Sequence, residues 1–142
     1  MINILPGIES TSAALQAERV RMAVASQNIA HANTTRGIDG KPYQRQSVVF
    51  ESVMAKTEAS FNGVSPQKVQ VSRIEKDTSG PRMIYNPSHP DADNAGMVAM
   101  PNINIHQEMA DMIVSSRAYE ANLAVVRNAR SMALQTLNIG KR

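Results

Sequence analysis

Apolar residues recur at every seventh position near both ends of the chain. They form two series: Ile8, Leu15, Met22 and Ile29, and then Met112, Tyr119, Val126 and Ala133. On a helix, this spacing places side chains in a narrow stripe that can pack against another helix. The pattern therefore predicts two long terminal helices whose stripes are buried against each other or against neighbouring copies of the chain.

The expected first helix is preceded by residues that interrupt helices. Pro6 and Gly7 stand before the repeat, and Ser10 or Thr11 can cap the helix that follows. Small residues, mainly alanine, flank the stripe, so a partner helix can approach closely. Glycine, aspartate and proline then turn the chain, and we expect the helix to end near Asn33.

The middle of the chain favours short strands. Three stretches rich in β-branched or aromatic residues are the expected strands: residues 43–51, 64–74 and 83–85. Residues 86–104 contain three prolines and many turn formers, which indicates an extended connector with room for a short strand at 97–100.

Most aromatic side chains belong to this middle segment. Four of the five lie there: Tyr43, Phe50, Phe61 and Tyr85. Because aromatic side chains bury a large apolar area, we expect a small compact core in this part of the chain.

The last part of the chain predicts one long helix. No glycine or proline interrupts residues 106–137, and Gly140 ends the pattern. The expected fold class is α+β, with terminal helices that form a coiled-coil-like core around a small β-rich middle. The predicted units are residues 1–35 and 105–142 for the helical core, and residues 36–104 for the β-rich segment and connector.

The apolar positions on both helices are the expected packing surface between subunits. They are Ile8, Leu15, Met22, Ile29, Met109, Met112, Tyr119, Leu123, Val126 and Leu137. Periodicity alone does not separate ordinary core positions from contacts between copies, because both produce the same stripe. A charge at Leu123 is expected to block assembly while leaving the middle folded.

The charged residues do not indicate a nucleic-acid surface. The chain has 15 Lys and Arg against 12 Asp and Glu, a net charge of +3, with no basic run. Nucleic-acid binding needs clustered positive charge and often aromatic platforms. We therefore expect no nucleic-acid partner.

Candidate metal ligands are few and scattered. The chain has no cysteine, and none of its histidines has a second ligand at helical spacing: His31, His89 and His106. The segment from Asp91 to Gly96 is similar to the start of a calcium loop, but Ala95 replaces an oxygen ligand and Asn102 stands where a bidentate glutamate is needed. We expect no metal and no cofactor.

The sequence also predicts no enzymatic site. It contains no nucleophile elbow, no serine–histidine–acid pattern and no glycine-rich phosphate loop. Glu108 and Asp111 form a carboxylate pair beside Met109 and Met112, where solvation on a helix face is the ordinary expectation. We therefore predict that catalytic residues are absent.

The beginning of the chain predicts neither a membrane helix nor a cleaved leader. Pro6, Gly7 and Glu9 interrupt the first apolar run before it reaches the length of a signal peptide. No later stretch approaches the roughly 18 apolar residues of a membrane span.

Two functional interpretations remain open from the residues alone, and a third, an enzyme, survives only if a cofactor or a cleft appears that the sequence does not show. One is a structural subunit that assembles through its terminal helices. The other is a soluble helical-hairpin module that binds a protein partner. Concentration-dependent assembly separates them, because a closed hairpin stays monomeric.

Several segments resemble bacterial flagellar rod and hook proteins. Residues 25–34, Ala-Ser-Gln-Asn-Ile-Ala-His-Ala-Asn-Thr, resemble the motif that ends the N-terminal helix in that family. Further matches follow in the expected order, and the short middle fits the proximal rod subunits better than the longer hook proteins. The residues that carry the resemblance are Asn28, Ala30, Asn33, Asn86, Pro87, Pro101, Asn102, Arg117, Tyr119 and Asn122.

The resemblance implies a structural subunit of the proximal rod, the drive shaft that transmits motor torque across the periplasm to the hook. It implies that the terminal helices build the inner tube of the rod. The implied partners are copies of the chain, other rod proteins, inner-membrane ring and rod-adaptor proteins, and the flagellar type III export apparatus. Export without a cleaved leader and a periplasmic location in the basal body would follow.

Overall fold

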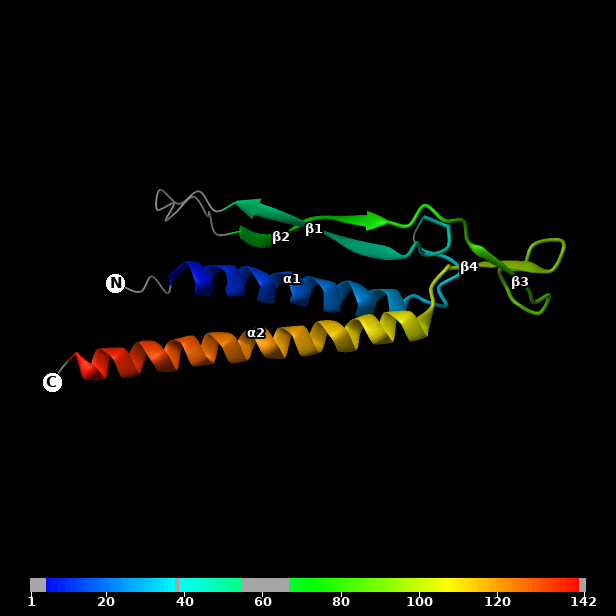
Figure 1. Cartoon of the computed structure of the whole chain (residues 1–142). Helices are drawn as coiled ribbons and strands as arrows, with labels where there is room; N and C mark the ends of the chain where they lie inside the picture. The colour runs from blue at the N-terminus through cyan, green and yellow to red at the C-terminus, as the bar shows by residue number, and fades with distance from the viewer. Residues whose placement is uncertain (1–4, 38, 55–66, 141–142) are drawn as a thin grey trace.

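A computed structural model describes residues 5–37, 39–54 and 67–140 of the chain (Figure 1). The elements are α1 (Leu5–Ala30), β1 (Gln46–Met54), β2 (Gln67–Lys76), β3 (Arg82–Tyr85), β4 (Met97–Met100) and α2 (Ile105–Ile139). Two long helices therefore enclose a β-rich middle in the sequence, and the predicted α+β class is confirmed.

The helices and strands form an elongated, layered molecule. α1 and α2 lie side by side and run in opposite directions, and the β1–β2 ribbon lies along α1 on the side away from α2 (Figure 1). α1 is thus the middle layer, packed against α2 and both strands of the ribbon. The β3–β4 hairpin projects beyond the end where the two helices meet the middle segment.

Both helices are longer than their apolar repeats. α1 begins at Leu5, so the expectation that Pro6 and Gly7 precede the helix is wrong. Proline is compatible with the first turn because backbone N–H groups there have no partner within the helix. α1 ends at Ala30, before the expected Asn33.

The ends of α2 are close to their expected positions. The side chain of Asn104 caps the helix by accepting a hydrogen bond from the His106 amide. At the other end, the Gly140 amide donates to the Thr136 oxygen.

The strands form two separate antiparallel pairs. β1 pairs with β2 from Gln46 opposite Lys76 to Met54 opposite Gln67, with a register irregularity between Val49 and Phe50. β1 starts three residues later than the expected strand at residue 43, because the segment before it turns to contact α1 and α2. Val64, an expected member of the second strand, lies outside the described residues.

The short strand at 97–100 is present and completes a hairpin. β3 pairs with β4 from Arg82 opposite Met100 to Tyr85 opposite Met97. This pairing makes use of the turn-rich residues 86–96, which connect the two strands.

The buried core lies mainly on α1, and the expectation of an aromatic core in the middle segment is wrong. The buried apolar residues are Ala17, Val24, Ala25, Ala32 and Val98. Phe50 and Tyr85 are 37% and 68% exposed, and Phe61 lies outside the described residues. A two-stranded ribbon covers only one face, whereas alanines on the middle helix allow neighbouring elements to approach from two sides.

The β3–β4 hairpin requires glycine at position 96. Gly96 has φ 75°, and a Cβ atom there would lie 2.9 Å from Cε2 of Tyr85. Gly40 has a similar φ of 71°, but among the described residues no heavy atom lies within 4 Å of the position that a Cβ atom would take there. The two sites therefore share the backbone requirement, and only Gly96 adds a steric one.

We predict that Gly96→Ala weakens the hairpin by about 2 kcal/mol or more, since the left-handed backbone alone costs about 1–2 kcal/mol and the ring of Tyr85 must also move. The measurement is amide exchange at Asn86, whose N–H donates to the Gly96 oxygen at 2.8 Å. Gly40→Ala is the matched control and should leave this exchange unchanged. Equal protection of Asn86 in the Gly96→Ala variant and the unaltered chain would contradict the prediction.

Candidate functional site

Most residues expected to pack between subunits are half-buried within the chain. They are Ile8, Leu15, Met22 and Ile29 on α1, and Met112, Tyr119, Leu123 and Val126 on α2. Met109 and Leu137 are different, with exposed fractions of 50% and 64%. The half-buried positions are already partly covered by other parts of the same chain, so their contact with further copies stays a prediction.

The side of α2 that packs on α1 combines two series of residues. At alternating spacings of four and three, the buried or half-buried positions are Glu108, Met112, Ser115, Tyr119, Asn122, Val126, Ala129 and Ala133. This alternation is the spacing of a coiled-coil seam. Apolar periodicity finds Met112, Tyr119 and Val126 but misses the second series, because most of its members are polar.

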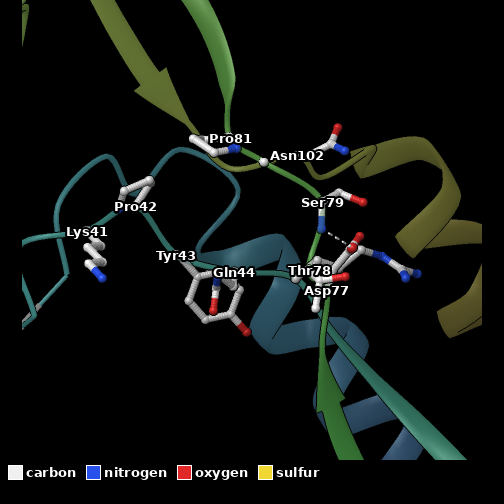
Figure 2. Close-up of a pocket in the computed structure, with 11 residues that line it drawn as sticks. Lys41, Pro42, Tyr43, Gln44, Asp77, Thr78, Ser79, Pro81 and Asn102 are labelled. Atoms are coloured by element: carbon white, nitrogen blue, oxygen red, sulfur yellow. Dashed lines mark hydrogen bonds between the residues drawn. The ribbon is translucent and has the colours of Figure 1, made fainter.

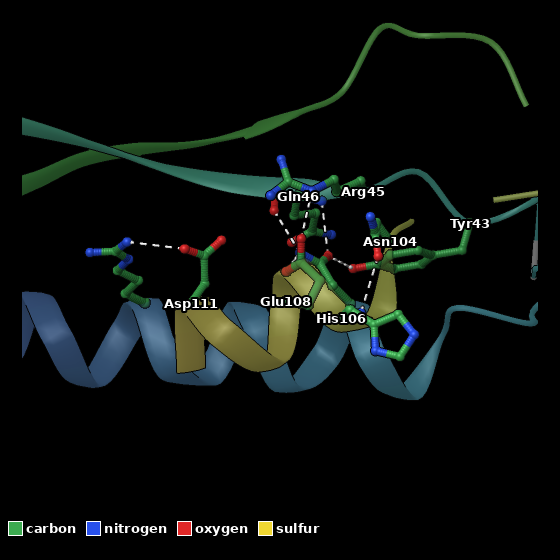
Figure 3. A network of polar contacts seen from close by, with 9 residues as sticks. Tyr43, Arg45, Gln46, Asn104, His106, Glu108 and Asp111 are labelled. Carbon is green, nitrogen blue, oxygen red and sulfur yellow. Dashed lines mark hydrogen bonds and ion pairs between the residues drawn. The ribbon is translucent and has the colours of Figure 1, made fainter. Parts of the chain in front are cut away.

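Asn28 is the centre of a buried polar network at the end of this seam (Figure 3). Its side chain is 1% exposed. The amide nitrogen donates to the Gln46 backbone oxygen at 2.8 Å and to Oε2 of Glu108 at 2.9 Å. The amide oxygen accepts from the Gln46 N–H at 2.9 Å and from the Tyr43 hydroxyl at 3.1 Å. All four hydrogen-bonding positions of one amide are used, and they join α1, β1 and α2.

Glu108 completes the network, and the expectation that it is solvated is wrong. Its residue exposure is 2%, and Oε1 accepts from Nε of Arg45 at 2.7 Å. A buried carboxylate is tolerated only where charge and hydrogen bonds compensate the lost water. Arg45 and Asn28 supply that compensation from distant positions in the chain.

The Arg21–Asp111 pair beside the network is a weaker interaction. Its nitrogen and oxygen are 3.4 Å apart, and more than a third of each side chain is exposed. Ion pairs with this exposure contribute about 0–1 kcal/mol. The pair adds little stability to the helix packing next to the buried Glu108.

Tyr43 connects the network to the turn after α1. Its ring stacks on His31 with 4.7 Å between ring centroids, and the imidazole of His31 is hydrogen-bonded to the Thr34 hydroxyl at 3.2 Å. Burial, together with the negative charge of Glu108, raises the pKa of the Tyr43 hydroxyl above its usual value. The hydroxyl is therefore held in its neutral, donating form.

The other residues of the recognised motifs are dispersed. Asn86 and Pro87 are exposed on the β3–β4 hairpin, Pro101 is buried, and Asn102 is exposed between β4 and α2. Ala30 at the end of α1 and Asn33 in the turn after it are exposed. On α2, Arg117 is exposed and Asn122 is half-buried in the seam. Asn28 enters the polar network, as do Tyr43 and Glu108 from two further segments that carry the resemblance.

A shallow hollow of about 330 Å³ lies between residues 41–45 and 77–81 (Figure 2). Hydrogen bonds from Ser79 lower the pKa of Asp77. The Asp77 carboxylate is therefore an acceptor within a local turn. Of the described residues that line the hollow, none is histidine or cysteine. The arrangement shows no nucleophile and base placed for catalysis among these residues.

The rest of the described chain offers neither a metal site nor a membrane helix. Within residues 5–37, 39–54 and 67–140, no group of three or more His, Cys, Asp or Glu side chains converges on a point that could hold a metal ion. Neither α1 nor α2 combines the length and apolar content that crossing a bilayer requires.

Comparison with known proteins gives a consistent result. The family described as "Flagellar basal body rod FlgEFG protein C-terminal" matches residues 94–139, which include β4 and all of α2. The flagellar basal-body rod protein FlgC of Borreliella burgdorferi is 39% identical, covering 97% of this chain and 98% of its relative. The proteins of the same name from Bacillus subtilis and Yersinia enterocolitica are 36% and 34% identical, covering 92% and 99% of this chain and 94% and 100% of their own lengths.

These relatives match along the whole molecule, from the helix that carries Asn28 to the helix that carries Glu108. The resemblance found in the sequence motifs is therefore confirmed at full length. The chain belongs to the family of flagellar basal-body rod protein FlgC.

Proposed function

We propose that this protein is a structural subunit of the flagellar basal-body rod, and that it transmits motor torque through contacts between its terminal helices and those of neighbouring subunits. Family membership supports the rod role. The observation that carries the mechanism is a stripe of apolar side chains on α2 that α1 leaves exposed.

The exposed stripe follows α2 for about five helical turns. It contains Val114, Ala121, Val125 and Met132, at spacings of seven, four and seven residues. Val114, Val125 and Met132 are 55%, 53% and 57% exposed. These spacings place the side chains on one flank of the helix, away from the centre of the seam with α1.

Burial of this stripe would supply the energy of subunit contact. Covering a Val or Met side chain contributes roughly 1.5–3 kcal/mol when burial is complete. Each subunit of a tube makes such contacts with several neighbours. The small free energies of the individual contacts therefore sum over the whole assembly. The contacts are distributed along the helix, which suits a shaft that resists twisting.

The alternative of a closed helical-hairpin binding module needs only the pairing of α1 with α2. That pairing is present, so it does not distinguish the two functions. The exposed stripe favours assembly, because a module that functions as a closed monomer gains nothing from a continuous apolar flank in water.

The finer details of this proposal rest on the resemblance to proximal rod subunits. We infer a position in the periplasmic part of the rod, with copies of the chain and other rod proteins as neighbours. Inner-membrane ring proteins, rod-adaptor proteins and the flagellar type III export apparatus are the further partners.

The test is mass spectrometry of purified basal bodies from cells that make this chain, with a count of copies per particle. Stoichiometric copies that resist a salt wash are expected, because apolar contacts are not screened by ions. Absence of the chain from otherwise complete basal bodies would overturn the proposal and favour the closed-hairpin module.

A further inference from the structure

The β3–β4 hairpin is attached to the rest of the molecule at few points. It projects beyond the end of the two helices (Figure 1), and among the described helices and strands β3 and β4 pack only against each other. Val98 is nevertheless only 2% exposed, so connecting segments, not helices or other strands, cover its side chain. We call residues 82–100 the hairpin unit.

The polar contacts between the hairpin unit and the rest of the described chain both end on Asp91. The Thr35 hydroxyl donates to Oδ2 of Asp91 at 2.8 Å, and Nη1 of Arg36 lies 3.9 Å from Oδ1. The other hydrogen bonds of the hairpin unit among the described residues stay within the unit. Because the apolar contact at Val98 is not directional, Asp91 is the group that fixes how the unit is oriented against the segment after α1.

His89 holds the Asp91 backbone in place. The Asp91 N–H donates to Nδ1 of His89 at 3.1 Å. An imidazole nitrogen accepts a hydrogen bond only when it carries no proton. In this structure His89 is therefore neutral, with its proton on Nε2.

We propose that Asp91, oriented by His89, is an acid-sensitive clasp. It holds the hairpin unit against the segment after α1 while His89 is neutral, and it releases the unit when His89 is protonated. We call the contacts of Asp91 with Thr35, Arg36 and His89 the Asp91 clasp. The inference goes beyond the proposed function, because it concerns the conformation of a single chain and needs no contact between copies.

Protonation of His89 weakens the Asp91 clasp in two ways. It places a second N–H at Nδ1, so that two donors face each other and the hydrogen bond to the Asp91 amide is lost. It also creates a cation two residues from the Asp91 carboxylate, where it competes with Thr35 for the same oxygens. The clasp is therefore complete where the imidazole is neutral and is lost as the pH falls through its titration. Histidine ordinarily changes its charge between about pH 5 and 8.

The neighbouring charged groups do not replace this clasp. The carboxylate of Asp93, in the same loop, already accepts from two amides of that loop. Arg36 faces Asp91 from the segment after α1, but its side chain is 72% exposed, and ion pairs of this kind are weak. Arg82 lies at the other end of β3 from the loop. The hydrogen bond from Thr35 is the main contact, and an ordinary hydrogen bond shifts an equilibrium between two forms by about fivefold.

The absence of cysteine from the sequence allows two spin labels to report the orientation of the hairpin unit in the full chain. Ser26→Cys on α1 and Asn94→Cys in the hairpin unit place the labels at exposed positions outside the clasp. The measurement is the distribution of distances between the labels by pulsed electron paramagnetic resonance. We expect a narrow distribution at about pH 8 and a broader one at about pH 5.5.

Three variants of the labelled chain separate the parts of the clasp. Asp91→Ala should give a broad distribution at both pH values. His89→Asn should stay narrow at both, because an asparagine oxygen accepts from the amide two residues ahead and does not titrate in this range. His106→Asn is the matched control, since His106 is exposed outside the hairpin unit, and it should broaden in acid as the parent chain does.

Amide exchange at Asn86 distinguishes release of the hairpin unit from its unfolding, because the Asn86 N–H donates to the Gly96 oxygen within the unit. Protection at Asn86 should persist while the distance distribution broadens. The proposal is overturned if the parent chain does not broaden in acid, if His89→Asn broadens in acid as the parent does, or if Asp91→Ala stays narrow. Loss of protection at Asn86 together with broadening would also overturn it, since the hairpin itself would then unfold.

Discussion

Asn28→Ala is expected to lower the free energy of unfolding by about 3 kcal/mol, since the substitution leaves several buried polar groups without partners. The carboxylate of Glu108 loses one of its two hydrogen-bonding partners, and the backbone N–H and oxygen of Gln46 lose theirs. The measurement is urea unfolding followed by circular dichroism at the helix signal.

Asn33→Ala is the control for this variant. Asn33 is exposed just after the same helix, so its replacement should change stability by no more than about 0.5 kcal/mol. If the two alanine variants unfold at the same urea concentration, the network does not hold the helices to β1.

Asn28→Asp tests the electrostatic part of the network with almost no change in shape. A carboxylate at this position faces the Glu108 oxygen that now lies 2.9 Å from the amide nitrogen. Two carboxylates this close cannot both stay ionised without cost, so the variant should be destabilised at neutral pH and recover as acid protonates one of them. Stability that does not improve on acidification would contradict this interpretation of the site.

Val125→Glu is expected to abolish swimming and incorporation into basal bodies while leaving the isolated subunit folded. Val125 is 53% exposed in the single chain, so the substitution should alter subunit stability by no more than about 0.5 kcal/mol. In the assembled rod the same side chain would be buried without a partner for its charge, which is strongly unfavourable. Swimming assays and basal-body composition in cells that carry only this variant measure the effect.

Ser131→Glu is the matched control, because Ser131 is exposed on another flank of α2. It introduces the same charge outside the stripe and should permit assembly. Normal swimming by the Val125→Glu variant would show that the stripe does not contribute to rod assembly.

Leu123→Asp is a poorer test than the sequence suggested, because Leu123 is half-buried within the chain. A charge at this position would also disturb the packing of α2 in the isolated subunit.

The two helices and the hairpin turn could be predicted because their signals are local. Residues 106–137 contain no helix breaker and keep one repeat throughout, so propensity and periodicity agree. The proline-rich and aspartate-rich stretch after Tyr85 likewise indicated a defined turn. The breaker rule places the start of α1 too late, because proline and glycine interrupt the interior of a helix, whereas the first helical turn accommodates both.

The polar network was not predictable in the same way. Asn28, Arg45 and Glu108 are separated by many residues, and a lone glutamate beside methionines on a helix is usually solvated. Its burial becomes favourable only when Arg45 and Asn28 arrive at the same point. No pattern in a single sequence predicts that these three side chains meet, because none of them is unusual among the residues that surround it in the chain.

The sequence by itself determined two long helices, a turn-rich β middle and the apolar series of Met112, Tyr119 and Val126, because these depend on neighbours within a few turns of the same segment. Tertiary structure decided that Glu108 is buried while Val125 is left in water, although both belong to one helix. The physical reason is that α1 covers only one side of α2, and burial depends on what a fold brings together as well as on the residues themselves.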